Sequence, residues 1–177
     1  MQLEINEKGS REFYTESVNV MAQFRRLQKK PNAKLLNYFK IYRTYIIVCA
    51  VMLLIIGAMW LAWGSDGFMP VAAALLAVAL LFSAVFLVSL NKTRKALLSS
   101  AGGSVLTLEN DYVQLEKTGS SKVQLNWENV QFVRVYKEAL CIHSKDGAGL
   151  IICVDRKYEA QVLDWLRENK PEVQLIR

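Results

Sequence analysis

The strongest constraint on the fold is a pair of apolar stretches at residues 44–65 and 67–90, neither of which contains a charged residue. Asp66, which separates them, is the one charged residue between positions 44 and 91. About 20 helical residues cross the hydrocarbon layer of a bilayer, so each stretch is long enough to span it. A soluble protein rarely buries a helix of this length without a charge. The sequence therefore predicts a membrane protein with two transmembrane helices.

The net charge of +6 is concentrated beside these stretches. Residues 1–43 hold nine Lys or Arg against four Asp or Glu, whereas residues 102–177 hold ten against eleven. Basic residues collect on the cytoplasmic flanks of membrane spans. We therefore expect a multi-pass protein of the cell (inner) membrane with both termini cytoplasmic, and no nucleic-acid partner. The residues assigned to the membrane surface are Arg25, Arg26, Lys29, Lys30, Lys34, Lys92, Arg94 and Lys95.

Residues 1–43 form the predicted cytoplasmic N-terminal segment, with a short strand at 2–6 and a basic amphipathic helix over 10–30. Ser10 is a suitable N-cap, and Pro31 should end or bend the helix. The apolar side of this helix has two open interpretations. It lies in the headgroup layer, bound to anionic lipid, or it packs on the soluble domain, or it does both. The residues on that side are Phe13, Val20, Phe24 and Leu27.

Residues 44–91 form the predicted transmembrane hairpin, and its first helix is expected to begin near Asn32. Gly64 and Gly67 predict a tight turn between the spans, which makes them antiparallel. Ionisable residues inside a membrane usually mark ion or proton pathways. Because neither span contains one, an anchor is favoured over a channel or transporter. Aromatic belts are predicted at Tyr38, Tyr42 and Tyr45 on the inner side and at Trp60, Trp63 and Phe68 on the outer side.

After a flexible linker at residues 99–104, the apolar period changes from helical to two, which is typical of strands. The sequence predicts a small α+β domain at residues 105–177, an antiparallel meander sheet capped by a C-terminal helix at 157–169. Hairpin turns are expected at residues 118–121 and 145–147. Whether residues 2–6 complete the sheet is left open. The predicted strands are residues 105–109, 112–116, 122–127, 130–136, 139–144 and 149–154.

Alternation along the first predicted hairpin pairs Val113 with Leu125 and Leu115 with Val123. Trp127 is expected in the core against the C-terminal helix, with a ligand groove as the alternative. We predict no catalytic, cofactor-binding or metal-binding residue.

Three residues could in principle support chemistry: Cys141, Cys153 and His143, the only histidine. A two-residue turn at 146–147 would place Cys141 opposite Ile152 and direct Cys153 to the other face. Only a slipped register would bring the thiols together. Structural zinc generally needs four ligands, and no fourth is evident nearby.

Two segments carry a family resemblance: Leu108-Glu109-Asn110-Asp111-Tyr112-Val113, and Leu125-Asn126-Trp127-Glu128-Asn129-Val130 followed by residues 150–154. Together with the hairpin ahead of them, they resemble the YcxB-like family of bacterial membrane proteins. The spacing of Trp127 and Val130 is similar to that in pleckstrin-homology-like (PH-like) domains. The resemblance implies a PH-like fold for the C-terminal domain and no established activity.

The leading functional hypothesis is a non-enzymatic membrane protein whose PH-like domain binds a protein partner, or another copy of itself, at the cytoplasmic face. The alternative is a sensor of anionic lipid or membrane stress that acts through the basic helix at residues 10–30. Its partners would be the lipid bilayer and anionic lipid headgroups.

Overall fold

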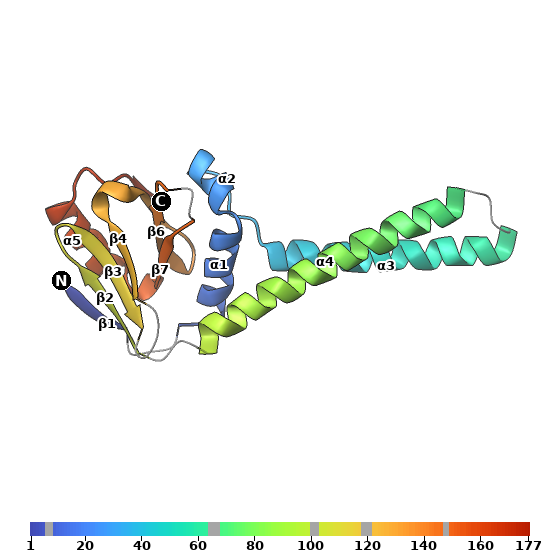
Figure 1. Cartoon of the computed structure of the whole chain (residues 1–177), viewed down its shortest axis with the longest axis horizontal. Coiled ribbons are helices and arrows are strands. Elements are labelled where there is room, and N and C mark those ends of the chain that lie inside the picture. Colours follow the sequence, from blue (N-terminus) through green and yellow to red (C-terminus); the bar gives the residue numbers. More distant parts are fainter. Residues whose placement is uncertain (6–8, 64–67, 100–102, 118–121, 147–148) are drawn as a thin grey trace. The chain divides into compact units, whose positions relative to one another are not determined.

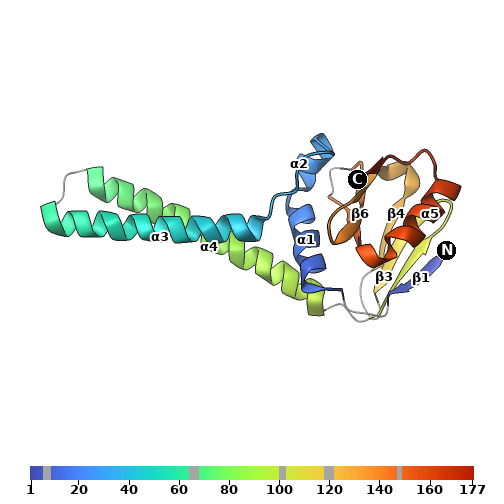
Figure 2. The same ribbon diagram turned by 180° about the vertical axis from the view of Figure 1, so that it is seen from behind.

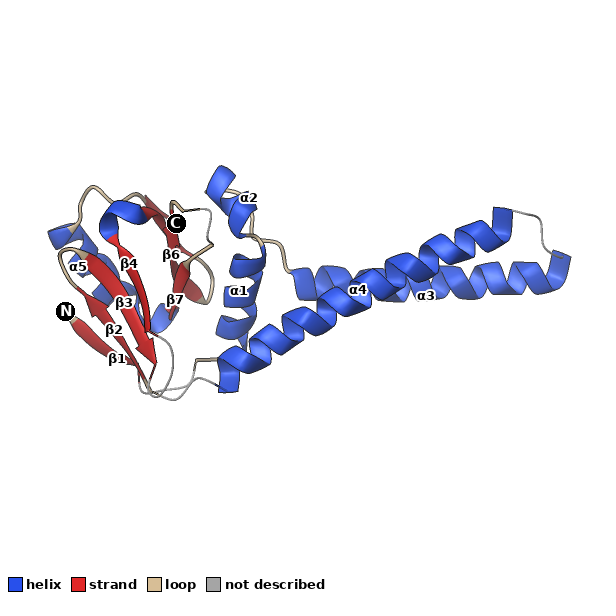
Figure 3. Cartoon of the chain, in the orientation of Figure 1, coloured by secondary structure: helices blue, strands red, loops and turns tan. Residues whose placement is uncertain are grey.

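The computed structural model of the 177-residue chain describes residues 1–5, 9–63, 68–99, 103–117, 122–146 and 149–177. Two compact units are present (Figure 1). We call them the sheet-containing unit, residues 1–36 and 94–177, and the helical unit, residues 37–93. The strands of the described chain all belong to the first of these (Figure 3). The predicted linker and turns fall wholly or partly outside the described residues.

Sheet A is antiparallel and contains, in order, β1 (Gln2–Ile5), β2 (Ser104–Leu108), β3 (Tyr112–Lys117) and β4 (Lys122–Asn126). β1 pairs with β2 so that Leu3 lies opposite Leu106. The N-terminal strand therefore completes the sheet built after the two long helices, which the sequence had left open. The predicted pairs of the first hairpin, Val113 with Leu125 and Leu115 with Val123, are confirmed.

Sheet B contains, in order, β7 (Ile151–Asp155), β6 (Ala139–Ser144), β5 (Val130–Val135) and β8 (Leu175–Ile176). The first three strands are antiparallel, and β8 runs parallel to β5. The single predicted meander is thus two sheets. The chain leaves sheet A at η1 (Trp127–Asn129), where the indole Nε1 donates a hydrogen bond to the Glu109 carbonyl at 2.7 Å. β8 was not predicted because two residues carry no periodic signal.

The predicted C-terminal helix is confirmed as α5 (Glu159–Asn169), preceded by the short helix η2 (Arg156–Tyr158). Asp155 caps η2 by accepting a hydrogen bond from the Lys157 N–H at 3.1 Å. In Figure 2, the view from behind, α5 lies across the strands. Its apolar side, Val162, Leu163 and Leu166, enters the core that sheets A and B share.

The predicted basic helix is two helices, α1 (Arg11–Ala22) and α2 (Phe24–Lys29). Ser10 caps α1 by accepting a hydrogen bond from the Phe13 N–H at 3.0 Å, as expected. The helix is interrupted at Gln23, whose side chain donates to the Leu36 carbonyl at 2.7 Å and accepts from the Leu36 N–H at 3.0 Å. The following segment is therefore held as a loop, so the next helix begins at Tyr38 and not near Asn32.

The apolar side of α1 and α2 packs on the face of sheet B that is remote from α5. Val20, Phe24 and Leu27 are buried against Ala139 and Cys141. Of the two interpretations that the sequence left open, the structure places this apolar side on the sheet.

The helical unit consists of α3 (Tyr38–Trp63) and most of α4 (Phe68–Ser99). The ring centroids of Tyr42 and Phe86 are 4.5 Å apart, so the two helices contact each other. Their most apolar 18-residue windows have mean hydropathies of 2.6 and 2.9, and only 6% of each window is buried. A core helix of a soluble protein would be mostly buried. Both helices are long and apolar enough to cross a membrane.

Candidate functional site

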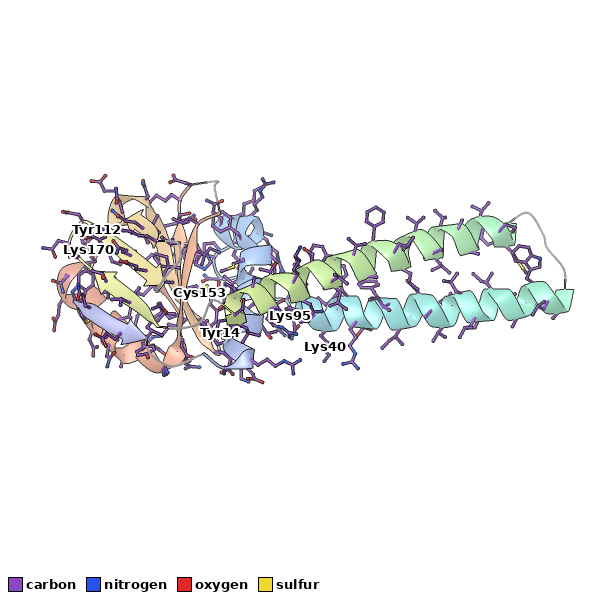
Figure 4. The ribbon with its side chains drawn as sticks, turned by 60° about the horizontal axis from the view of Figure 1, so that its bottom comes forward. Tyr14, Lys40, Lys95, Tyr112, Cys153 and Lys170 are labelled. Atoms are coloured by element: carbon purple, nitrogen blue, oxygen red, sulfur yellow. The ribbon has the colours of Figure 1, made fainter. Side chains whose placement is uncertain are left out.

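A cavity of about 200 Å³ lies within the sheet-containing unit, bounded by α1, β7 and sheet A. We call it the β7 pocket. For comparison, an apolar cavity of about 150 Å³ holds a benzene-sized molecule. All five residues of β7 line the pocket, and α1 contributes Phe13, Tyr14, Ser17 and Met21. Figure 4 labels Tyr14 and Cys153, which come from α1 and β7. Sheet A and the adjoining segments contribute Ile5, Gly9, Leu97, Ser104, Leu115 and Val123.

β7 is an end strand of sheet B, so one of its edges pairs with no strand of the described chain. The Ser144 N–H donates to the Leu150 carbonyl, and the Arg156 N–H donates to the Glu138 carbonyl. Antiparallel ladders alternate, so the even-numbered residues of β7 bond β6, and the backbone groups of Ile151, Cys153 and Asp155 point away from it. Within the described chain these outward groups pair with no other strand. The β7 pocket thus lies along a strand that can still accept a partner.

Tyr14 is a titratable side chain that lines the pocket. Burial raises its pKa above the ordinary value, partly offset by a hydrogen bond from the Gly9 backbone, and Asp155 raises it further. The phenol therefore stays protonated at physiological pH. A Cβ at Gly9, which also lines the pocket, would lie 2.5 Å from Phe13 Cδ1, so a larger residue here would require the Phe13 ring to shift.

The two thiols of sheet B lie together, which corrects the predicted register. Cys141 is directly opposite Cys153, and their Sγ atoms are 2.7 Å apart. The connection between β6 and β7 is longer than the predicted two-residue turn, because the hydrogen bond at the ends of the two strands runs from the Ser144 N–H to the Leu150 carbonyl. One extra residue shifts the register and brings both thiols to the same face.

His143 is enclosed in the sheet and acts as a packing residue. Its ring stacks on Phe132, with centroids 4.3 Å apart, and its Nε2 lies 3.1 Å from the Tyr136 hydroxyl. Burial, with a smaller effect of the Arg134 charge, lowers the His143 pKa to about 3, so the imidazole is neutral at physiological pH. Among the described residues, no group of three or more His, Cys, Asp or Glu is placed to hold a metal ion.

Trp127 lies in the core against α5, as the sequence predicted. Its indole is 5% exposed and stacks on Trp165 of α5, with ring centroids 5.6 Å apart. One face of the indole contacts Trp165 and its Nε1 donates to the Glu109 carbonyl, so the side chain packs between η1 and α5.

The basic residues assigned to the membrane surface are not gathered into one site. Those on α2 and after it, Arg25, Arg26, Lys29, Lys30 and Lys34, are exposed, and the first four surround a shallow depression with Gln28. On α4, Lys92 and Lys95 are exposed, whereas Arg94 is half-buried and donates to the Thr15 hydroxyl of α1 at 3.4 Å.

The sequence did not indicate the β7 pocket, because its walls come from segments more than a hundred residues apart. The apolar wall residues each have the pattern of an ordinary core position. Comparisons with family models, with curated proteins and with solved structures gave no match to this chain.

Proposed function

We propose that this chain is a non-enzymatic integral membrane protein whose sheet-containing unit binds a protein segment, supplied by a partner or by a second copy, at the cytoplasmic face. The proposal rests on one observation: beside an apolar pocket, an edge of β7 pairs with no strand among the described residues. An extended segment that adds to a sheet edge gains main-chain hydrogen bonds, and pockets for its alternate side chains give specificity. The β7 pocket has room for one or two apolar side chains of such a segment.

Three further observations support parts of this proposal. The largely exposed apolar surface of α3 and α4 supports membrane anchoring. The charge asymmetry beside them supports a cytoplasmic position for the sheets. A non-enzymatic role is supported by the enclosure of His143 and Cys141, two of the three residues that could support chemistry. Two four-stranded sheets with a C-terminal helix on their core also agree with the PH-like fold that the YcxB-like resemblance implies.

The test uses the outward N–H of Cys153. Cys153→Pro removes this donor, and proline is tolerated in an edge strand where its nitrogen faces away from the ladder. Cys153→Ala is the matched control, because it removes the same thiol and keeps the N–H. Each full-length protein is crosslinked in its native membrane, captured and analysed by mass spectrometry.

We expect the wild type and Cys153→Ala to capture the same partner, or the same dimer, and Cys153→Pro to lose it. Thermal unfolding of the two variants shows whether both are folded to the same extent. Equal capture by two folded variants would contradict binding at the β7 edge.

A second candidate function, an anionic-lipid sensor, is favoured by the arrangement of α2. Its basic residues are exposed, while Phe24 and Leu27 on its other side are buried on sheet B. The apolar side is thus not available for insertion, and lipid attraction would be electrostatic, roughly 1 kcal/mol for each basic residue near the surface.

The lipid-sensor proposal predicts a salt-dependent loss of vesicle binding when Arg25, Arg26, Lys29 and Lys30 are changed to Gln. The full chain in zwitterionic nanodiscs is mixed with anionic vesicles at low and at high salt. The matched control changes four basic residues elsewhere, Lys122, Lys137, Arg167 and Arg177. If both quadruple variants bind equally, α2 is not the lipid-binding element.

A further inference from the structure

The geometry of β6 and β7 points to a redox site: we propose that Cys141 and Cys153 form a reversible disulfide when the protein meets a hydroperoxide. Two residues directly opposite each other at a non-hydrogen-bonded position of antiparallel strands have Cα atoms about 4.5 Å apart. Cys141 and Cys153 occupy such a position. Ser144 bonds Leu150 and Arg156 bonds Glu138, so the hydrogen-bonded pairs alternate along the ladder and include 142 with 152 and 140 with 154, on either side of the two cysteines. Disulfides bridge Cα separations of about 4.4–6.8 Å. The strands can therefore accept the bond without moving apart or together.

The side chains already point to the same face of sheet B. The Cys141 thiol donates a hydrogen bond to Cys153 Sγ at 2.7 Å, and both side chains pack in the cluster under α1 and α2. Bond formation therefore requires only a small adjustment of the two side chains. Nearby titratable side chains on the packed elements are Glu16 of α1, Tyr136 after β5 and His143 of β6.

The two thiols differ in their access to a reagent. Cys141 is fully buried, and burial, reinforced by the hydrogen bond to Cys153, raises its pKa. Cys153 is partly exposed and lines the β7 pocket. Hydrogen peroxide is close to water in size, so the pocket admits it. Cys153 is therefore the thiol that reacts first, and Cys141 is the one that resolves the product.

The reaction proceeds in two balanced steps. The Cys153 thiolate attacks one peroxide oxygen: an S–O bond forms, the O–O bond breaks, and the leaving hydroxide takes up the thiol proton as water. Cys141 then attacks the Cys153 sulfur: the S–S bond forms, the S–O bond breaks, and the hydroxyl leaves with the Cys141 proton as a second water. Two thiols are oxidised to one disulfide, and one peroxide is reduced to two waters.

Oxidation would change the wall of the β7 pocket, because the Cys153 sulfur would be fixed to Cys141 and its thiol hydrogen lost. It would also join β6 covalently to the strand whose free edge borders the pocket. This chemistry depends on the geometry of the two strands and not on what the pocket binds, so it can succeed or fail independently of the proposed function.

The test treats the full-length protein in detergent micelles with hydrogen peroxide, stops the reaction with catalase, and alkylates the remaining thiols after denaturation. We expect two of the three thiols to be lost together, a mass decrease of two hydrogen atoms per chain, and recovery of both thiols with dithiothreitol. Peptide mapping should show Cys141 linked to Cys153 and Cys49 alkylated. Cys49→Ser is the matched control and should lose the same two thiols.

Cys141→Ala separates the two steps. Without its resolving thiol, Cys153 should accumulate as a sulfenic acid that dimedone traps, and no disulfide should form. If this variant does not fold, the peptide map of the wild type decides alone. Retention of all three thiols, conversion of Cys153 to a sulfinic acid with Cys141 still alkylated, or a disulfide between two chains would each overturn the proposal.

Discussion

His143 illustrates how a residue that attracts functional hypotheses is used for packing. It is fully buried on β6, between the Phe132 ring and the Tyr136 hydroxyl. An imidazolium ion in this position would lose its hydration without gaining an anionic partner, which is why burial lowers the His143 pKa to about 3. Because protonation of the buried imidazole is unfavourable, acid should destabilise the folded state.

At the residue scale, we predict that His143 makes the sheet-containing unit less stable as the pH falls from about 6.5 towards 3. Its pKa is lower in the folded chain than in the unfolded chain, so the unfolded chain binds the extra proton in this range. Between pH 6.5 and pH 5 the loss should be about 2 kcal/mol. His143→Gln should flatten this dependence.

The measurement is urea unfolding of the full chain in micelles, followed by tryptophan fluorescence at several pH values. Glu16 works in the opposite direction, because burial raises its pKa and acid then favours the folded state. The comparison of the wild type with His143→Gln cancels the Glu16 contribution. Parallel pH curves for the two proteins would show that His143 is not the source.

At the scale of elements, α1 and α2 belong to the sheet-containing unit because specific contacts join them to it. The Glu16 carboxylate accepts a hydrogen bond from the Glu138 N–H at 2.6 Å, at the turn between β5 and β6. Gln28 of α2 donates to the Lys145 carbonyl at 2.6 Å, beyond β6. These polar contacts lie at opposite ends of β6, and the apolar contacts of Leu27 and its neighbours lie between them.

The packing of α2 on the sheet predicts that Leu27→Ala lowers the free energy of unfolding by about 2–5 kcal/mol, as expected for a fully buried leucine. The matched control, Leu175→Ala, shortens a leucine that is 39% exposed and should cost much less. Urea unfolding of the two variants checks both values. If Leu27→Ala unfolds like the wild type, α2 does not pack on sheet B in solution.

At the scale of the whole molecule, the helical unit is an insertion in the sequence of the sheet-containing unit: residues 37–93 lie between segments 1–36 and 94–177. β1 and β2 close this insertion by pairing with each other. An antiparallel pair of spans suits such an insertion, because it returns the chain to the side from which it started. If the two helices cross a membrane as we propose, both segments of the sheet-containing unit lie on one side of it.

This arrangement predicts the labelling of single cysteines by a membrane-impermeant maleimide in spheroplasts. Phe68→Cys, at an 80% exposed position at the start of α4, should be labelled from outside. Lys137→Cys, whose native side chain is 84% exposed, should be labelled only after the membrane is opened. The wild type gives the background of the three native cysteines. Labelling of Lys137→Cys in intact spheroplasts would reverse the predicted orientation.

Features that depend on local pattern could be predicted from the sequence. Charge-free length predicted the two long helices, alternation predicted six strands and the pairing of Val113 with Leu125, and Ser10 predicted the start of α1. These features follow from neighbouring residues, because period, capping and turn chemistry act over a few positions. The packing of Trp127 against α5 was also predictable, since a large apolar residue between two strands needs a cover.

Features in which distant segments meet could not be predicted in this way and became visible only in the folded chain. The division into two sheets depends on where Trp127 turns the chain, and the break at Gln23 depends on Leu36. The juxtaposition of Cys141 and Cys153 depends on one residue in the connection between β6 and β7, because a register shift of one reverses the side of every side chain. The β7 pocket needs α1, β7 and sheet A together. No local pattern encodes such contacts, because their energy is gained only when all of the segments are in place.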